Sequence, residues 1–234
     1  MCNFCKSDRL YTFMPLYHAN SGLLMVSSAF IYGCTLVIRK KFSASNFATD
    51  CVKYKINVFN YIGEVCRYLC NSKPSENDKL VNIKIAVGNG MRKNVWIQLK
   101  EKYKIEQIVE FYGSSEGNVS AINLHGKVGA CGYYPVFVSK HLFFCIVKCD
   151  EDGEIILDNK NHAVLCEENQ IGHLIGKIMR AFVFTRFDGY IDRSATNKKI
   201  ASNLFKTGDK YYLSGDLFTI DEYGYLYFYD RIGE

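Results

Sequence analysis

Residues 108–116 read Ile-Val-Glu-Phe-Tyr-Gly-Ser-Ser-Glu, a short apolar run that gives way to a glycine and small polar residues. This pattern predicts a buried strand that ends in a loop. The same pattern occurs upstream, where the apolar run 81–87 leads into Gly88-Asn89-Gly90. Ligands on parallel sheets bind at the carboxyl ends of the strands, so both loops are candidate site segments.

Helical patterns separate the strands in the first half of the chain. Residues 21–32 are almost wholly apolar and predict a buried helix, followed by a turn at Gly33 and a buried strand over 34–38. Ser43 is placed to cap the next helix, on which one face is formed by Ala44, Phe47, Ala48 and Cys51. The other elements predicted here are a strand over 57–61 and helices around 65–69 and 95–103. Short apolar strands between helices predict an α/β fold with a mostly parallel sheet flanked by helices.

From about Gly126 the pattern changes to short strands and turns. Residues 136–148 are rich in strand formers, and hairpin turns are predicted at Asp150-Glu151-Asp152-Gly153 and Asp221-Glu222-Tyr223-Gly224. The second turn joins predicted strands over 213–220 and 225–229. We therefore expect two subdomains, an α/β part over 1–126 and a β-rich part over 127–234.

The composition is that of a folded protein, with 234 residues of which 48% are hydrophobic and 23% charged. The net charge of +5 arises from short basic runs such as Arg39-Lys40-Lys41. Because these runs form no basic face interleaved with aromatic residues, we expect no nucleic acid partner. The ten cysteines are dispersed, and metal-type spacing is confined to Cys2 and Cys5. A reduced, cytosol-facing protein is therefore expected.

One stretch without charged residues, from Leu10 to Ile38, raises the question of a membrane span. Its most apolar part, residues 23–38, is shorter than the ~20 residues that a spanning helix needs. A buried helix, a turn and a buried strand account for this stretch better. No positively charged segment followed by an apolar run and a cleavage site opens the chain, so no signal peptide is predicted.

Two motifs carry a resemblance to a known family. Residues 110–116 resemble the Y-G-x-T-E motif of the adenylate-forming (ANL) superfamily, with Ser115 in place of threonine. Residues 212–216, Tyr-Leu-Ser-Gly-Asp, resemble its Y-x-[TS]-G-D motif, and Asp230-Arg231 opens the stretch that holds its hinge. Within this superfamily the chain is most similar to the fatty acid transport protein / very-long-chain acyl-CoA synthetase family. Collinear phrases that carry this similarity are Pro15-Leu16-Tyr17-His18, Tyr61-Ile62-Gly63-Glu64, Gly88-Asn89-Gly90-Met91-Arg92, Arg186-Phe187-Asp188-Gly189-Tyr190 and Asn197-Lys198-Lys199-Ile200-Ala201.

The resemblance implies a fatty acid–CoA ligase that works in two steps. A fatty carboxylate attacks the α-phosphate of ATP to give acyl-adenylate and pyrophosphate, and the thiol of coenzyme A then displaces AMP. The resemblance implies fatty acid, ATP and coenzyme A as substrates, Mg²⁺ on the phosphates, and fatty acid uptake coupled to the reaction. It also implies a membrane-associated, cytosol-facing protein of the endoplasmic reticulum, plasma membrane or peroxisome, for which homo-oligomerisation stays open.

The loop after residue 111 supplies most of the implied catalytic groups. Glu116 matches the Mg²⁺ ligand, since this ion is often held by one carboxylate together with phosphate oxygens and water. Ser115 matches the hydroxyl that contacts the α-phosphate, and Tyr112, Gly113 and Ser114 complete the nucleotide-binding loop. The alternative interpretation is a strand-to-helix turn capped by Ser114.

Other segments complete the implied site. Gly88-Asn89-Gly90 matches the segment against which adenine packs, although alone it indicates only a turn. His18 matches a position between the acyl pocket and the adenylate, and a structural role for it stays open. Asp216 matches the ribose ligand and Arg231 a donor to ribose or phosphate, with an exposed hairpin-end arginine as the alternative. A second Gly-Asp pair, in Thr207-Gly208-Asp209, is expected in a solvated turn.

Two parts of the family pattern are missing from these 234 residues. A T-S-G-T-T-G-x-P-K phosphate-binding loop does not precede the Tyr112 loop, and the domain with the family's adenylation lysine does not follow Asp230-Arg231. We therefore expect the chain alone to be inactive as a synthetase. The alternative hypothesis is a non-catalytic AMP- or acyl-binding remnant, or a partner of a full-length synthetase.

Overall fold

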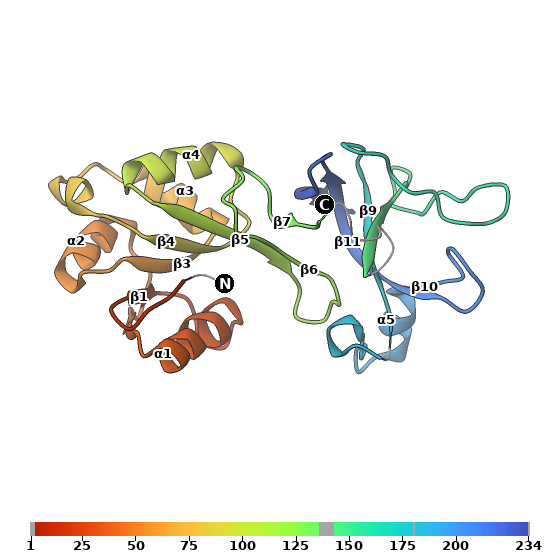
Figure 1. Ribbon diagram of the computed structural model, residues 1–234, viewed down its shortest axis with the longest axis horizontal. Helices are drawn as coiled ribbons and strands as arrows, with labels where there is room; N and C mark the ends of the chain where they lie inside the picture. Colours follow the sequence, from red (N-terminus) through yellow and green to blue (C-terminus); the bar gives the residue numbers. More distant parts are fainter. Residues whose placement is uncertain (1–2, 136–142, 180, 234) are drawn as a thin grey trace. The chain divides into compact units, whose positions relative to one another are not determined.

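A computed structural model describes residues 3–135, 143–179 and 181–233 of the chain (Figure 1). The chain forms two compact units. Unit 1 consists of Met1–Phe111 and Ile122–Gly129, and unit 2 of Tyr112–Ala121 and Ala130–Glu234. The Tyr112 loop therefore belongs with the second half of the chain. A boundary between functional subdomains at residue 126 stays a prediction.

The first sheet has the strand order β2-β1-β3-β4-β5-β6. Its strands are β1 (Arg9–Thr12), β2 (Thr35–Ile38), β3 (Val58–Ile62), β4 (Ile85–Asn89), β5 (Gln107–Gly113) and β6 (Ser120–Asn123). The pairs β1–β2, β1–β3, β3–β4 and β4–β5 are all parallel. The expected mostly parallel sheet is confirmed, and the carboxyl ends of β3, β4 and β5 lie along one edge of it.

Helices cover both faces of this sheet (Figure 1). They are η1 (Asn20–Val26), α1 (Ser27–Tyr32), α2 (Ala44–Tyr54), α3 (Gly63–Asn71), η2 (Glu76–Leu80) and α4 (Lys93–Lys102). Side chains alternate along the strands, so Phe59 joins the core under α2, α3 and α4, whereas Val58 joins the core beneath η1. Both cores are apolar, and burial of their side chains is the main force that holds the layers together.

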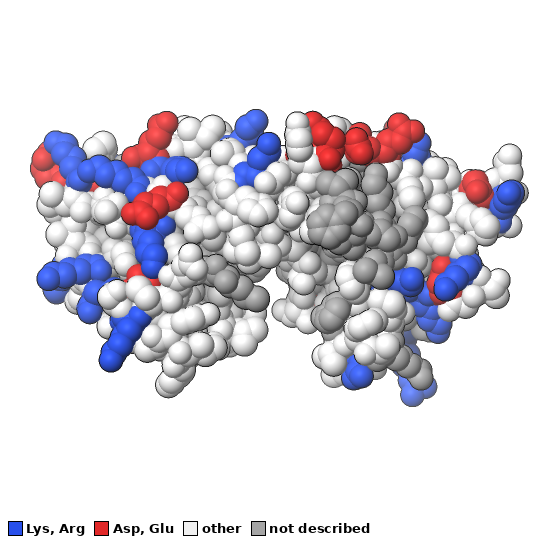
Figure 2. All heavy atoms as spheres, in the orientation of Figure 1, with Lys and Arg blue, Asp and Glu red and all other residues white. Residues whose placement is uncertain are grey.

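Two expectations for unit 1 are wrong in detail, and one strand was not predicted. The helix over 21–32 is only partly buried, because Met25 is fully buried whereas Leu23, Phe30 and Ile31 are 71%, 85% and 72% exposed. Figure 2 accordingly shows few charged side chains over α1. The strand over 34–38 is the exposed edge strand β2, since β1 occupies the inner position. The four-residue β1 is missed by the sequence analysis because it lies inside the long uncharged stretch.

Local details in unit 1 also differ from expectation. Ser43 does precede α2, but its side chain makes no capping hydrogen bond. The strand expected over 81–87 begins only at Ile85, and Gly88 and Asn89 are its last residues. The turn expected at Gly33 is confirmed, with φ +68°.

Unit 2 contains an antiparallel sheet with the order β7-β12-β11-β9-β8, and β10 pairs with β11. Its elements are β7 (Gly132–Tyr133), β8 (Phe144–Val147), β9 (Gly172–Lys177), η3 (Val183–Thr185), α5 (Arg193–Lys198), β10 (Ile200–Ser202), β11 (Lys210–Ile220) and β12 (Tyr225–Arg231). The hairpin at Asp221–Gly224 is confirmed, since β11 and β12 are antiparallel neighbours. Of the strand-rich run over 136–148, residues 136–142 lie outside the described residues.

Two other expectations concern the cysteines and a membrane span. Every cysteine from Cys5 to Cys166 in the described residues is a free thiol, while Cys2 lies outside them. Among the described residues, no helix is long and apolar enough to cross a membrane.

Candidate functional site

The Tyr112 loop leaves the end of β5 as irregular chain. Ser114, Ser115 and Glu116 are exposed, and the Gly117 N–H donates to Ser114 Oγ at 3.0 Å. No helix begins between Ser114 and β6, so the alternative of a helix capped by Ser114 is wrong. Downstream, Asn118 Nδ2 donates to the carbonyls of Lys177 and Thr185, both at 3.0 Å. Asn118 thus anchors the loop to β9, a role for which the sequence offers no signal.

A bulge in β11 presents Asp216. Leu213 pairs with Ile175 of β9 and Leu217 pairs with His173, so residues 214–216 face a single residue of the neighbouring strand. Gly215 supplies the positive φ of +80° that the bulge requires. Ser214 Oγ donates to the Leu174 carbonyl at 2.7 Å and accepts from the Asp216 N–H at 3.0 Å. The Y-x-S-G-D motif therefore forms a defined backbone feature.

Two side chains hold the Asp216 carboxylate, which is 7% exposed. The Tyr112 hydroxyl donates to Oδ2 at 2.5 Å, and Arg231 Nε donates to Oδ1 at 3.1 Å from the neighbouring strand β12. Burial first, and then the Asp216 carboxylate, raise the pKa of Tyr112 above its usual range, so the phenol keeps the proton that it donates. The structure thus brings together Tyr112, Asp216 and Arg231 from segments far apart in sequence.

His173 supports the bulge from β9. Its Nε2 accepts from the Gly215 N–H at 3.1 Å, and its Nδ1 lies 3.2 Å from the Gly153 carbonyl. Burial lowers the pKa of His173, which favours the neutral ring with Nδ1–H as donor and Nε2 as acceptor. Sequence reasoning missed this residue because a single histidine within a strand carries no distinguishing pattern.

Glu116 is the candidate Mg²⁺ ligand that the sequence analysis singles out. Its side chain is exposed, and the Tyr190 hydroxyl donates to its Oε1 at 3.5 Å. No group of three or more His, Cys, Asp or Glu side chains that could hold a metal is found among the described residues. A single carboxylate fits Mg²⁺ only where phosphate oxygens and water supply the remaining ligands.

The segment Gly88-Asn89-Gly90 lies in unit 1, at the carboxyl end of β4. A Cβ on Gly88 would come within 2.1 Å of the Tyr61 carbonyl oxygen, so only glycine fits beside β3. Gly90 has φ +78°, and the next N–H, of Met91, donates to Glu110 Oε1 at 2.9 Å. Burial raises the pKa of Glu110 to about 7. A buried carboxyl therefore fixes the turn that follows the segment.

His18 and Asp209 complete the set of residues that the sequence singles out. His18 is exposed in a turn of unit 1, and its ring centroid lies 4.4 Å from that of Tyr17. Asp209 is 7% exposed and accepts from the backbone N–H groups of Leu204, Phe205 and Lys206 at 2.8–3.0 Å. The expectation of a solvated turn for Asp209 is wrong, because its carboxylate closes the turn from inside.

Comparison with known proteins decides the family. Residues 2–160 match the model of the AMP-binding enzyme family. This chain belongs to that family. It is 43% identical over 229 residues to human long-chain fatty acid transport protein 1, a match that covers 97% of this chain and 35% of the relative. The chain therefore spans about a third of the length of this relative, and the resemblance in its motifs is confirmed.

Solved structures give the same fold. ATP-bound MatB from Rhodopseudomonas palustris superposes with a TM-score of 0.70 at 17% identity, over 97% of this chain and 41% of that one. O-succinylbenzoate coenzyme A synthetase from Bacillus subtilis, in complex with ATP and magnesium ion, gives a TM-score of 0.61 at 21% identity. That match covers 98% of this chain and 42% of the synthetase.

Proposed function

We propose that this chain is the nucleotide-binding part of an ATP-dependent long- or very-long-chain fatty acid–CoA ligase, whose reaction is coupled to fatty acid uptake. The observation that carries the proposal is the buried Asp216 carboxylate, held by Tyr112 and Arg231. A carboxylate offers about four lone-pair sites, of which these contacts use two. The remaining two are available to accept the 2′ and 3′ hydroxyls of a ribose.

In this proposal the exposed loop handles the phosphates. Ser115 donates its hydroxyl to the α-phosphate, and Glu116 is the protein ligand of Mg²⁺. When bound, Mg²⁺ neutralises charge on the phosphates and so lowers the repulsion that an attacking carboxylate meets. Arg231, whose side chain is 60% exposed, is the proposed donor to ribose or phosphate.

Unit 1 supplies the adenine and acyl contacts in this proposal. Gly88-Asn89-Gly90 lies against adenine, and His18 lies between the acyl group and the adenylate. The identity to a long-chain fatty acid transport protein supports a fatty acid substrate, coenzyme A as acceptor and membrane association of the longer protein. The bacterial synthetase bound to ATP and magnesium supports the choice of nucleotide and ion.

We further propose that the 234-residue chain alone does not complete the reaction, since it corresponds to 35% of its human relative. The alternative proposal is a non-catalytic AMP- or acyl-binding remnant, or a partner of a full-length synthetase. The ligase proposal and this alternative predict different results when the chain replaces the matched part of a complete synthetase: acyl-CoA forms under the first and does not form under the second.

The test uses a hybrid in which residues 1–234 replace the matched part of human long-chain fatty acid transport protein 1. We expect the hybrid to form oleoyl-CoA from oleate, ATP, Mg²⁺ and coenzyme A, and the 234-residue chain to show no turnover. Glu116→Gln in the hybrid should abolish most oleate-dependent pyrophosphate exchange, because a carboxamide keeps the shape but loses the charge that holds Mg²⁺. Glu222→Gln, an exposed carboxylate of the β11–β12 hairpin, is the matched control. A folded but inactive hybrid would overturn the ligase proposal, and normal exchange with Glu116→Gln would overturn the assignment of Glu116 as the Mg²⁺ ligand.

A further inference from the structure

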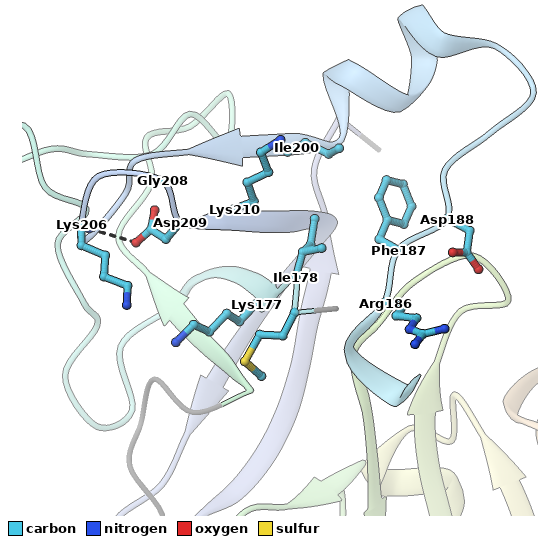
Figure 3. A pocket seen from close by; sticks show the side chains of 11 residues that line it. Lys177, Ile178, Arg186, Phe187, Asp188, Ile200, Lys206, Gly208, Asp209 and Lys210 are labelled. Carbon is cyan, nitrogen blue, oxygen red and sulfur yellow. Dashed lines mark hydrogen bonds between the residues drawn. The ribbon is translucent and has the colours of Figure 1, made fainter. Parts of the chain in front are cut away.

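A basic pocket of about 690 Å³ lies in unit 2 (Figure 3). Its basic side chains are Lys177, Arg186, Lys206 and Lys210. Lys177 ends β9 and Lys210 begins β11, while Lys206 lies in the turn between β10 and β11. Different segments of the fold therefore direct positive charge into one hollow, of a size usual for small-molecule sites.

The positive charge of this basic pocket is not balanced by its acidic residues. Two carboxylates line it, and that of Asp209 is already occupied by three backbone N–H groups of its own turn. The other, Asp188, is exposed. Within the described part of the chain, the ammonium groups of Lys177, Lys206 and Lys210 have neither a hydrogen bond nor an ion pair. Like charges that share a hollow repel each other, and a bound anion relieves that repulsion.

An apolar wall adjoins the cations. Phe187 and Ile200 line the pocket and are half-buried. The Phe187 ring packs against Tyr212 of the Y-x-S-G-D motif, with 4.7 Å between ring centroids. A site with several cations beside an aromatic ring suits a ligand that joins phosphate to a ring or a hydrocarbon.

We propose that the basic pocket binds a phosphorylated organic ligand through Lys177, Lys206 and Lys210, with Phe187 against its uncharged part. Two sources share this chemistry, the 3′-phospho-ADP part of coenzyme A and the headgroup of an anionic phospholipid. The proposal does not depend on the ligase reaction, because it concerns binding by the 234-residue chain itself.

The test measures binding to the 234-residue chain by calorimetry and vesicle sedimentation. The probes are coenzyme A, dephospho-coenzyme A, inorganic phosphate, and phosphatidylcholine vesicles with and without phosphatidic acid. The variant Lys177→Gln/Lys206→Gln/Lys210→Gln should bind the organic phosphate about tenfold more weakly, as expected for a few solvent-accessible charge pairs. Its binding should also depend less on salt. The matched control Lys73→Gln/Lys100→Gln/Lys160→Gln removes three exposed lysines elsewhere and should bind normally.

Asp188→Asn provides a test that misfolding does not imitate. Removing the exposed carboxylate of the pocket should strengthen binding of the same probe, since a negative charge facing the anion is lost. Preference for coenzyme A over its dephospho form assigns the pocket to the cofactor, and binding only to vesicles that contain phosphatidic acid assigns it to a headgroup. The proposal is wrong if the two triple variants bind the probe equally, or if Asp188→Asn weakens binding. It is also wrong if inorganic phosphate binds and none of the organic phosphates does.

Discussion

Gly208-Asp209 and Gly215-Asp216 look alike in sequence, and their carboxylates are used in different ways. Both glycines have positive φ, +86° and +80°, and both aspartates are 7% exposed. Asp209 is bound by three N–H groups from residues 204–206, directly before it in the chain. Asp216 is bound by side chains from β5 and β12. The Asp209 carboxylate accepts three hydrogen bonds from its own turn and so stabilises that turn. The Asp216 carboxylate accepts two from neighbouring strands, which leaves lone pairs that could accept from a ligand.

The largest expected effect tests which aspartate binds ribose. Asp216→Ala should weaken binding of ATP or AMP on the order of 30- to 1000-fold, or about 2–4 kcal/mol, because two hydroxyl acceptors are lost. Asp209→Ala should leave the affinity of the folded fraction nearly unchanged. Calorimetric titration of each variant of the 234-residue chain measures both values. If the two effects are exchanged, Asp209 is the ligand and the assignment of Arg231 fails with that of Asp216.

The second expected effect concerns stability, and here Asp209 is the residue whose loss should matter. Asp209→Ala should lower the free energy of unfolding by roughly 2–3 kcal/mol, since it leaves one buried and two partly buried backbone N–H groups without their acceptor. Asp209→Asn should cost less, because the amide oxygen still accepts. Urea denaturation of both variants, with Glu222→Ala as an exposed control, measures the difference. A loss for Asp209→Ala no larger than for the control would show that the turn does not need its carboxylate.

The sequence was sufficient for the elements that depend on local pattern. Alternation and turn residues predicted the hairpin at Asp221–Gly224, and apolar runs predicted most of the parallel strands. It was insufficient where contacts are long-range. The edge position of β2 depends on which strand lies beside it, and the burial of Asp209 depends on how its turn folds back.

Some residues of the candidate site were predicted from the sequence, and others were not. The resemblance to the family's motifs selected Asp216 and the Tyr112 loop, and the Tyr112–Asp216 contact links residues 104 positions apart. The supporting residues Asn118 and His173 bind backbone groups across the sheet, and no spacing in the sequence indicates such bonds. A motif can therefore identify the groups of a site while the bonds that position them stay hidden.

The smallest expected effect tests how the Asp216 bulge is supported. His173 is buried, its pKa is lowered from 6.5, and its Nε2 accepts from the Gly215 N–H. Below pH 6.5 the unfolded chain takes up a proton at this position more readily than the folded chain does. The contribution of His173 to stability is therefore fully present above that pH and is lost as the pH falls toward the lower folded value.

His173→Gln keeps an acceptor for Gly215 and a donor for Gly153 but does not titrate. Its free energy of unfolding at pH 7.5 should be within about 1 kcal/mol of the original, the value of one hydrogen bond. Between pH 7.5 and pH 5.5 it should lose less stability than the original chain, and its affinity for AMP should fall less. His162→Gln, at an exposed turn, should keep the original pH dependence. Equal pH slopes for the original chain and His173→Gln would mean that the neutral imidazole does not hold the bulge, and the support of Asp216 would then come from Ser214, Tyr112 and Arg231.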